Sequence, residues 1–248
     1  MSSKPWRAEV VIFFLAAQFI CFFAGMIAIW FLHHFHVSGF VEENDFGNVI
    51  IATLSFQGVT WVLIPVFLRL HSINWRDEFG LRGKMFRPIG LAVLALIVIL
   101  PAVGWLEQFS ELLLQKFGWQ SPEEEAVTLI AGAKTLPMKV YLGFFAVVMA
   151  PVAEEFIFRG VLYRFVKQLG FPKLAWLGTS ALFAAIHGSP AIFPSLFLLA
   201  LTFAWLYEKT GNLLAPVFAH SLFNGVNLVI LLFQDSIEDW MQKFSHHA

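Results

Sequence analysis

Residues 138–169 read MKVYLGFFAVVMAPVAEEFIFRGVLYRFVKQL and are apolar over most of their length. A helix needs about 20 such residues to cross the roughly 30 Å of hydrocarbon in a bilayer. Glu154, Glu155 and Arg159 lie in the middle of this apolar segment. Ionisable side chains are costly at that depth, so they normally face the interior of a helix bundle and serve a function. The segment therefore predicts a membrane helix that carries a functional site.

The composition of the whole chain excludes several classes of protein. The 248 residues are 58% hydrophobic and 13% charged, whereas soluble domains are about 25% charged. The formal net charge of −1 and the absence of a Lys/Arg-rich run argue against binding to nucleic acid. Cys21 is the single cysteine, which excludes a disulfide framework or a cysteine-cluster metal site, and we expect a buried structural thiol. An integral membrane protein remains.

Apolar runs separated by charged residues predict an all-α, polytopic transmembrane helix bundle of about seven spans, with six to eight compatible with the pattern. The expected spans are Val10–Leu32, Asn48–Leu68, Pro88–Leu106, Met138–Leu169, Pro172–His187, Ile192–Tyr207 and Asn212–Phe233. With the N-terminus in the cytoplasm, most Lys and Arg residues fall in the inside segments, and acidic residues dominate the outside loops. This distribution predicts a cytoplasmic N-terminus and an external C-terminus.

The same pattern divides the chain into four parts. Residues 1–109 are expected to form N-terminal accessory transmembrane helices, and residues 110–137 an extramembrane connector. Residues 138–234 are expected to form a core of transmembrane helices, which the family resemblance described below implies is the catalytic core, followed by a polar tail at 235–248. The sequence shows no internal repeat and no second soluble domain.

Four further polar residues interrupt apolar sequence in the C-terminal half, namely His187, His220, Asn224 and, as a weaker candidate, Asn227. Glu155 and Arg159 are four residues apart, so on one helix they share a face in the favourable order for an ion pair. His220 and Asn224 have the same spacing and point the same way. Residues 170–172 form a helix-breaking Gly-Phe-Pro turn, and Glu154 and His187 are equally far from it. In an antiparallel hairpin they would lie at equal depth.

A buried carboxylate close to imidazoles suits the activation of water. Glu154 can take a proton from water, and His187 can hold the same water and later return the proton to a leaving amine. His220 and the Asn224 amide are donors suited to the negative oxygen of a tetrahedral intermediate. Glu155 and Arg159 would support Glu154. The constellation predicts hydrolysis of an amide bond in a water-accessible cavity.

The motifs Glu154-Glu155-x-x-x-Arg159, Phe183-x-x-x-His187 and His220-x-x-x-Asn224 occur in that order on successive predicted helices. They resemble the pattern of the CAAX-protease and bacteriocin-processing family (CPBP or Abi), which are intramembrane endopeptidases similar to type II CAAX prenyl proteases. The resemblance covers about residues 138–233, and none of the motif residues departs from it.

The resemblance implies a role for each matching residue. Glu154 would be the general base and His187 its partner on the water. His220 and Asn224 would form an oxyanion hole, with Glu155 and Arg159 as supporting residues. Members are often classed as metalloproteases, and Glu154, His187 and His220 could ligate zinc in a three-ligand open site. Because Asn224 is a poor zinc ligand, we favour a mechanism that needs no cofactor, with a divalent metal as the alternative.

Other intramembrane proteases fit less well. Zinc proteases of the site-2 type need the motif His-Glu-x-x-His, which is absent from the sequence. Aspartyl proteases need two intramembrane Asp residues, whereas every Asp of this chain lies outside the predicted spans. A rhomboid-like serine mechanism would use Ser180 with His220, since His187 lies about 10 Å from Ser180 along the same helix. Outside enzymes, the alternatives are a non-catalytic family member acting as a membrane scaffold or an immunity or regulatory protein, and a small transporter.

The expected partners are a peptide or membrane-protein substrate and the lipid bilayer, with no nucleic acid. A short chain without targeting signals favours the plasma membrane of a prokaryote.

Overall fold

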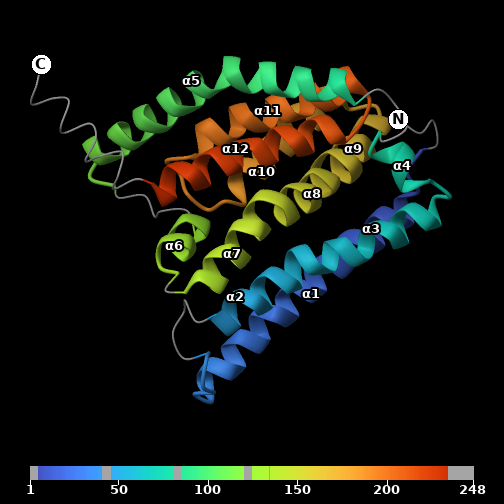
Figure 1. The fold of residues 1–248 in the computed structure, drawn as a ribbon. Helices are drawn as coiled ribbons and strands as arrows, with labels where there is room; N and C mark the ends of the chain where they lie inside the picture. Colours follow the sequence, from blue (N-terminus) through green and yellow to red (C-terminus); the bar gives the residue numbers. More distant parts are fainter. Residues whose placement is uncertain (1–4, 41–45, 81–84, 120–124, 134, 234–248) are drawn as a thin grey trace, which may run out of the picture.

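The computed structural model describes residues 5–40, 46–80, 85–119, 125–133 and 135–233, and every regular element in these ranges is helical (Figure 1). The predicted all-α class is therefore confirmed. The predicted tail at 235–248 lies outside the described residues. In chain order the elements, with π-helical segments written η, are α1 (Ala8–His34), α2 (Phe46–Thr53), η1 (Leu54–Gly58), α3 (Val59–Leu70), α4 (Trp75–Glu78), α5 (Phe86–Lys116), α6 (Glu125–Ala131), α7 (Leu136–Phe144), η2 (Phe145–Met149), α8 (Ala150–Glu155), η3 (Phe156–Tyr163), α9 (Arg164–Gln168), α10 (Pro172–Ala185), α11 (Phe193–Thr210) and α12 (Leu214–Leu232).

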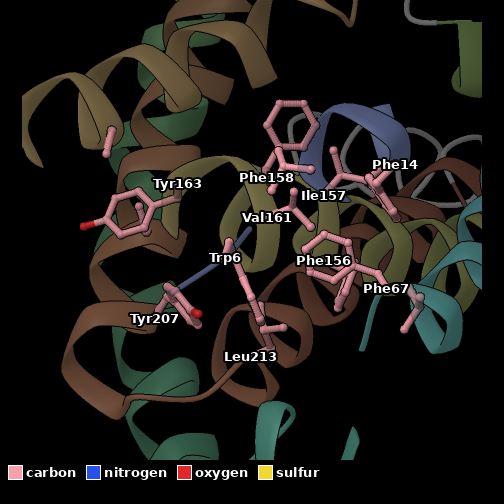
Figure 2. Close-up of a cluster of buried hydrophobic side chains, with 14 of the residues drawn as sticks. Trp6, Phe14, Phe67, Phe156, Ile157, Phe158, Val161, Tyr163, Tyr207 and Leu213 are labelled. Carbon is pink, nitrogen blue, oxygen red and sulfur yellow. The ribbon is translucent and has the colours of Figure 1, made fainter. Parts of the chain in front are cut away.

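The helices pack on two opposite sides of one long central helix (Figure 1). The elements from α7 to α9 follow one another without a break and make this central helix. On one side lie α1 and the α2–α3 helix, and on the other lie α10, α11 and α12 with α5 outermost. Both sides bury apolar side chains. One cluster joins α1 and α3 to η3 and α11 (Figure 2), and a second joins α5 to α10, α11 and α12.

Five helices in the described residues are long and apolar enough to cross a membrane. They are Ala8–His34, Phe46–Leu70, Phe86–Lys116, Leu136–Gln168 and Leu214–Leu232. The segments predicted as the fifth and sixth spans are also helical, as α10 and α11. However, α10 has 14 residues, or about 21 Å at 1.5 Å per residue, less than the thickness of the hydrocarbon. The helices thus match the seven apolar runs, while the number of spans stays a prediction.

Two helices end at other residues than the apolar runs predict. α10 ends at Ala185, so His187 lies in the turn that follows the helix and not within it. α5 continues to Lys116, so the connector predicted to begin at residue 110 begins inside this helix. The residues that extend α5 include Glu, Leu, Gln and Lys, which favour helix without needing a membrane around them. The apolar run therefore underestimates the length of α5.

The chain segment before α1 docks onto the end of α3 through His71. The His71 Nδ1–H donates to the Phe67 carbonyl at 2.9 Å, and its Nε2 accepts the Arg7 backbone N–H at 3.0 Å. Both ring nitrogens are thus used by the neutral imidazole, and burial lowers the pKa of His71. Its stabilising contribution is present above the unfolded-state pKa of about 6.5. It is lost as the pH falls from there towards the lowered folded-state pKa, because the unfolded chain then binds the extra proton.

We therefore expect the melting temperature to fall between pH 7.5 and pH 5 by less in His71→Phe than in the unmodified protein. Thermal unfolding in detergent at several pH values measures this difference. His34→Phe is the matched control, since His34 is exposed at the end of α1. An identical pH dependence in His71→Phe and the unmodified protein would contradict the assignment.

Candidate active site

Two π-helical segments bracket the adjacent glutamates on the central helix. η2 ends at Met149, and η3 begins at Phe156. Between them lies the short helix α8, whose last two residues are Glu154 and Glu155. π-helical turns are rare and occur frequently at functional sites, because they shift the side chains that follow and interrupt the regular ladder of backbone hydrogen bonds. The two glutamates therefore lie in a part of the helix with unusual backbone geometry on both sides.

Glu155 is the centre of a buried network. Its Oε1 accepts a hydrogen bond from Arg159 Nη1 at 2.9 Å, so the ion pair predicted from the i,i+4 spacing is present. The same oxygen accepts from His220 Nδ1 at 3.0 Å. Glu155 and Arg159 are 0% and 1% exposed. One carboxylate thus fixes both a cation on its own helix and an imidazole on α12.

Arg159 also ties the central helix to α11. Its Nη2 donates to the Ala200 carbonyl at 2.9 Å, and its guanidinium lies over the ring of Phe183 at 4.8 Å and that of Phe203 at 5.4 Å. Buried charges are tolerated when they are paired and hydrogen-bonded in this way. Arg159 consequently holds η3, α10 and α11 together around the glutamates.

His220 lies between the two glutamates. Because Glu155 accepts a charge-assisted hydrogen bond from Arg159, it is a carboxylate, and the His220 Nδ1 carries the hydrogen that points to it. The opposite ring nitrogen, Nε2, faces Glu154 Oε2 at 3.9 Å. The imidazole is stacked on Phe203 with 5.1 Å between the ring centroids. Glu155 and Phe203 therefore aim the free edge of His220 at Glu154.

Glu154 is the more accessible of the two glutamates. Its side chain is 13% exposed, against 0% for Glu155. Its Oε2 is buried and has no hydrogen-bond partner in the described part of the chain. An unpaired buried carboxylate oxygen is costly, and such groups call for a functional explanation. Glu154 thus has an oxygen available for a ligand or a proton beside His220.

His187 approaches the same region from the end of α10. Its Nδ1 donates to the Phe183 carbonyl at 2.8 Å, which leaves Nε2 of the neutral ring as an acceptor. The Phe183 ring touches His187 and His220, with centroid distances of 4.9 and 5.7 Å. The phenylalanine of the Phe-x-x-x-His motif therefore orients its histidine through the backbone, and its ring contacts both imidazoles.

Asn224 makes a contact that the sequence did not predict. Its Nδ2 donates to the Ala146 carbonyl in η2 at 2.8 Å. One of the two amide hydrogens expected to stabilise an oxyanion thus holds the central helix, and the second hydrogen remains on the same nitrogen. His220 and Asn224 do lie on the same helix, α12, in consecutive turns.

The three candidate zinc ligands are not arranged as a metal-binding site in the described part of the chain. In the described ranges, no group of three or more His, Cys, Asp or Glu side chains could hold a metal ion. Glu154, His187 and His220 are therefore not assembled as three ligands of a zinc ion in this structure. Ser180, the alternative nucleophile, is 0% exposed on α10.

Sequence reasoning missed the backbone and aromatic parts of the site. The Ala146 and Ala200 carbonyls accept side-chain hydrogen bonds, and Phe203 supports His220. Every residue has a backbone carbonyl, so the sequence does not indicate which carbonyls accept side-chain hydrogen bonds. Phe203 is one of 29 phenylalanines, so only its position after folding sets it apart.

The comparisons with known proteins agree with the resemblance drawn from the motifs. Residues 136–226 match the family model described as "Type II CAAX prenyl endopeptidase Rce1-like". The chain is 22% identical over 240 residues to "Putative membrane peptidase YdiL" of Bacillus subtilis, covering 94% of this chain and 93% of that protein. It is 28% identical over 171 residues to "Membrane-embedded CAAX protease MroQ" of Staphylococcus aureus, covering 66% of this chain and 65% of that protein. No solved structure matches at a significant level.

These matches confirm the similarity to membrane CAAX-type peptidases and support an integral membrane peptidase. They do not favour a scaffold or a transporter. The matched residues 136–226 contain the central helix and both histidine motifs.

Proposed function

Because residues 136–226 match the type II CAAX prenyl endopeptidase family, we propose that this protein is an intramembrane endopeptidase in which Glu154 activates the attacking water. The observation that carries the proposal is the unpartnered Glu154 Oε2 facing His220 Nε2 at 3.9 Å. His220 already donates through Nδ1 to Glu155. When the His220 ring is neutral, its Nε2 presents a lone pair to the Glu154 carboxylate, and these two acceptors repel each other. A single proton between Glu154 and His220 removes this repulsion.

In the proposed reaction, Glu154 and His187 carry a proton from the attacking water to the leaving amine. Glu154 takes a proton from a water molecule as the water oxygen bonds to the scissile carbonyl carbon, and the carbonyl electron pair moves to its oxygen. His187 Nε2 accepts the second water hydrogen as a hydrogen bond and so orients the water. When the tetrahedral intermediate collapses, the C–N bond breaks and the proton on Glu154 passes through His187 to the leaving amine. The products are a carboxylic acid and an amine.

The negative oxygen of the intermediate needs donors. We assign this role to His220 Nε2–H, in the state in which His220 holds the shared proton, and to the second Asn224 amide hydrogen. Glu155 keeps the His220 ring in place through Nδ1. No step passes through a metal ion. If zinc is bound, Glu154, His187 and His220 would have to move together to hold it, and the ion would polarise the carbonyl and the water.

Asn224→Ala tests the oxyanion assignment. We expect turnover to fall about 10²-fold, the usual effect of removing one such donor, and the melting temperature to fall slightly because the Ala146 carbonyl loses its donor. Steady-state cleavage by the purified variant measures the effect. Asn227→Ala, an exposed asparagine farther along α12, is the control and should keep full activity. Full activity in Asn224→Ala would exclude this residue from the reaction.

A substrate-trapping experiment tests the function itself. Glu154→Gln is expected to bind the substrate without cutting it, so an affinity-tagged variant expressed in a prokaryotic host should retain a peptide or membrane protein that the unmodified enzyme releases. Mass spectrometry of the trapped protein and of its fragments maps the cut, and shows whether a prenyl group is present. The proposal fails if the trapped proteins are never cut by the unmodified enzyme.

We further propose that the protein lies in a prokaryotic plasma membrane with its N-terminus in the cytoplasm. The excess of Lys and Arg in the predicted inside segments supports this orientation.

A further inference from the structure

In the described part of the chain, three side chains from outside the central helix donate hydrogen bonds to carbonyls within its two π-helical segments. Trp6 Nε1 donates to the Gly160 carbonyl in η3 at 2.7 Å. Trp61 Nε1, on α3, donates to the Met149 carbonyl at the end of η2 at 3.2 Å. The third donor is Asn224, described above. The two tryptophans thus hold the helix on either side of Glu154.

The Gly160 carbonyl lacks the hydrogen-bond partner that a regular α-helix would give it, and Trp6 supplies a donor from outside the helix. In an α-helix this carbonyl would accept the Arg164 N–H. Here the Arg164 N–H bonds to the Val161 carbonyl instead. A backbone carbonyl without a partner in apolar surroundings costs several kcal/mol, and neighbouring helices supply donors where a membrane helix is irregular. The Trp6 indole therefore stabilises this local backbone geometry.

Trp6 is itself held firmly. It is 2% exposed, and its backbone N–H and carbonyl both bond to the Gln168 side-chain amide at 2.7 Å. The Arg164 guanidinium lies 3.8 Å from the centre of its ring. Figure 2 shows Trp6 among Val161 and other buried side chains of this cluster. Each contact on the central helix lies after Arg159, so Trp6 touches none of the residues proposed to react.

We propose that Trp6 and Trp61 are positioning residues, which fix the two π-helical segments so that the Glu154 carboxylate faces His220. The inference rests on the proposed function, and it assigns a task to two residues outside the matched residues 136–226. The effect acts through the Gly160 and Met149 carbonyls. Loss of either indole N–H would allow the helix around Glu154 to relax towards regular α-helical hydrogen bonding.

The test compares Trp6→Phe, Trp61→Phe and the double variant with the control Trp30→Phe. Phenylalanine keeps an aromatic ring and removes the indole donor. Trp30 is 64% exposed on α1 and contacts His34. With a cleaved peptide as substrate, we expect kcat to fall about fivefold in each single variant, which corresponds to one hydrogen bond, and further in the double variant. KM should stay unchanged, and Trp30→Phe should behave like the unmodified protein.

Hydrogen exchange of the backbone amides gives a second readout that does not depend on activity. We expect faster exchange in residues 145–164 of the variants and no change in α5 or α12. The inference is overturned if exchange and kcat both stay at their original values. It is also overturned if exchange rises evenly along the whole chain and activity falls only with the folded fraction, since the tryptophans would then merely stabilise the fold. If the unmodified protein cleaves no peptide, the proposed function fails, and local exchange alone decides whether the indoles hold the helix.

Discussion

Glu154→Gln should leave a folded protein with almost no peptidase activity. The amide cannot take a proton from water, and removing a positioned general base costs about 10² to 10⁴ in rate. The fold should tolerate the change because the two side chains have nearly the same shape and Glu154 Oε2 has no hydrogen-bond partner to lose in the described part of the chain. Cleavage rates and thermal unfolding of the purified protein in lipid nanodiscs measure the two effects separately.

Glu111→Gln is the matched control for this variant. Glu111 is exposed on α5 and accepts a hydrogen bond from Gln115, so its replacement should change neither rate nor stability. His187→Ala should be impaired like Glu154→Gln, since both side chains are assigned to one water molecule. Near-normal cleavage by folded Glu154→Gln and His187→Ala would remove these residues from the reaction.

Glu155→Ala should damage stability as well as rate. It leaves Arg159 buried without its carboxylate, and breaking one side of a buried pair costs about 3 to 5 kcal/mol. It also removes the acceptor that holds His220 Nδ1, so the imidazole no longer faces Glu154 reliably. We expect a lower yield, a lower melting temperature and loss of activity together. Expression level, unfolding in mixed micelles and cleavage are the three measurements.

A double variant separates the two roles of Glu155. Glu155→Leu with Arg159→Met replaces the ion pair with apolar side chains of similar size, which is often neutral or even stabilising. We expect this protein to recover stability relative to Glu155→Ala while staying inactive, because His220 still lacks its acceptor. A Glu155→Ala protein as stable as Glu154→Gln would show that the buried pair contributes little to the fold.

The sequence predicts those parts of the site that depend on one helix or one turn. The Glu155–Arg159 pair follows from an i,i+4 spacing, and the hairpin between α9 and α10 follows from the residues at 170–172. Gly170 has φ +95° in this turn, and Pro172 begins α10. Spacing within a helix fixes geometry locally, so no tertiary information is needed.

Contacts between helices were beyond that reasoning. The depth of His220 depends on how α12 slides against the central helix, and its contact with both glutamates became evident only in the structure. The Asn224 amide was expected to donate to the negative oxygen of the intermediate, and one of its hydrogens is instead donated to the Ala146 carbonyl. The π-helical segments that expose such carbonyls carry no residue signature, because they arise from packing rather than from propensity.

Hydropathy has a similar limit for the fold. It predicts the five long apolar helices well, because the length of an apolar run reflects the thickness of the bilayer. α10 is shorter than that thickness and packs against α11 and the end of the central helix. A short helix buried in a bundle and a membrane span have the same apolar composition, so the sequence alone does not distinguish them.

Cleavage of the trapped substrate in water enriched with ¹⁸O tests the central claim most directly. The account predicts that the unmodified protein produces a new C-terminal carboxylate carrying one ¹⁸O atom, and that folded Glu154→Gln produces none of this fragment. Formation of the labelled fragment by Glu154→Gln at the unmodified rate would contradict the assignment of Glu154 as the base that activates water.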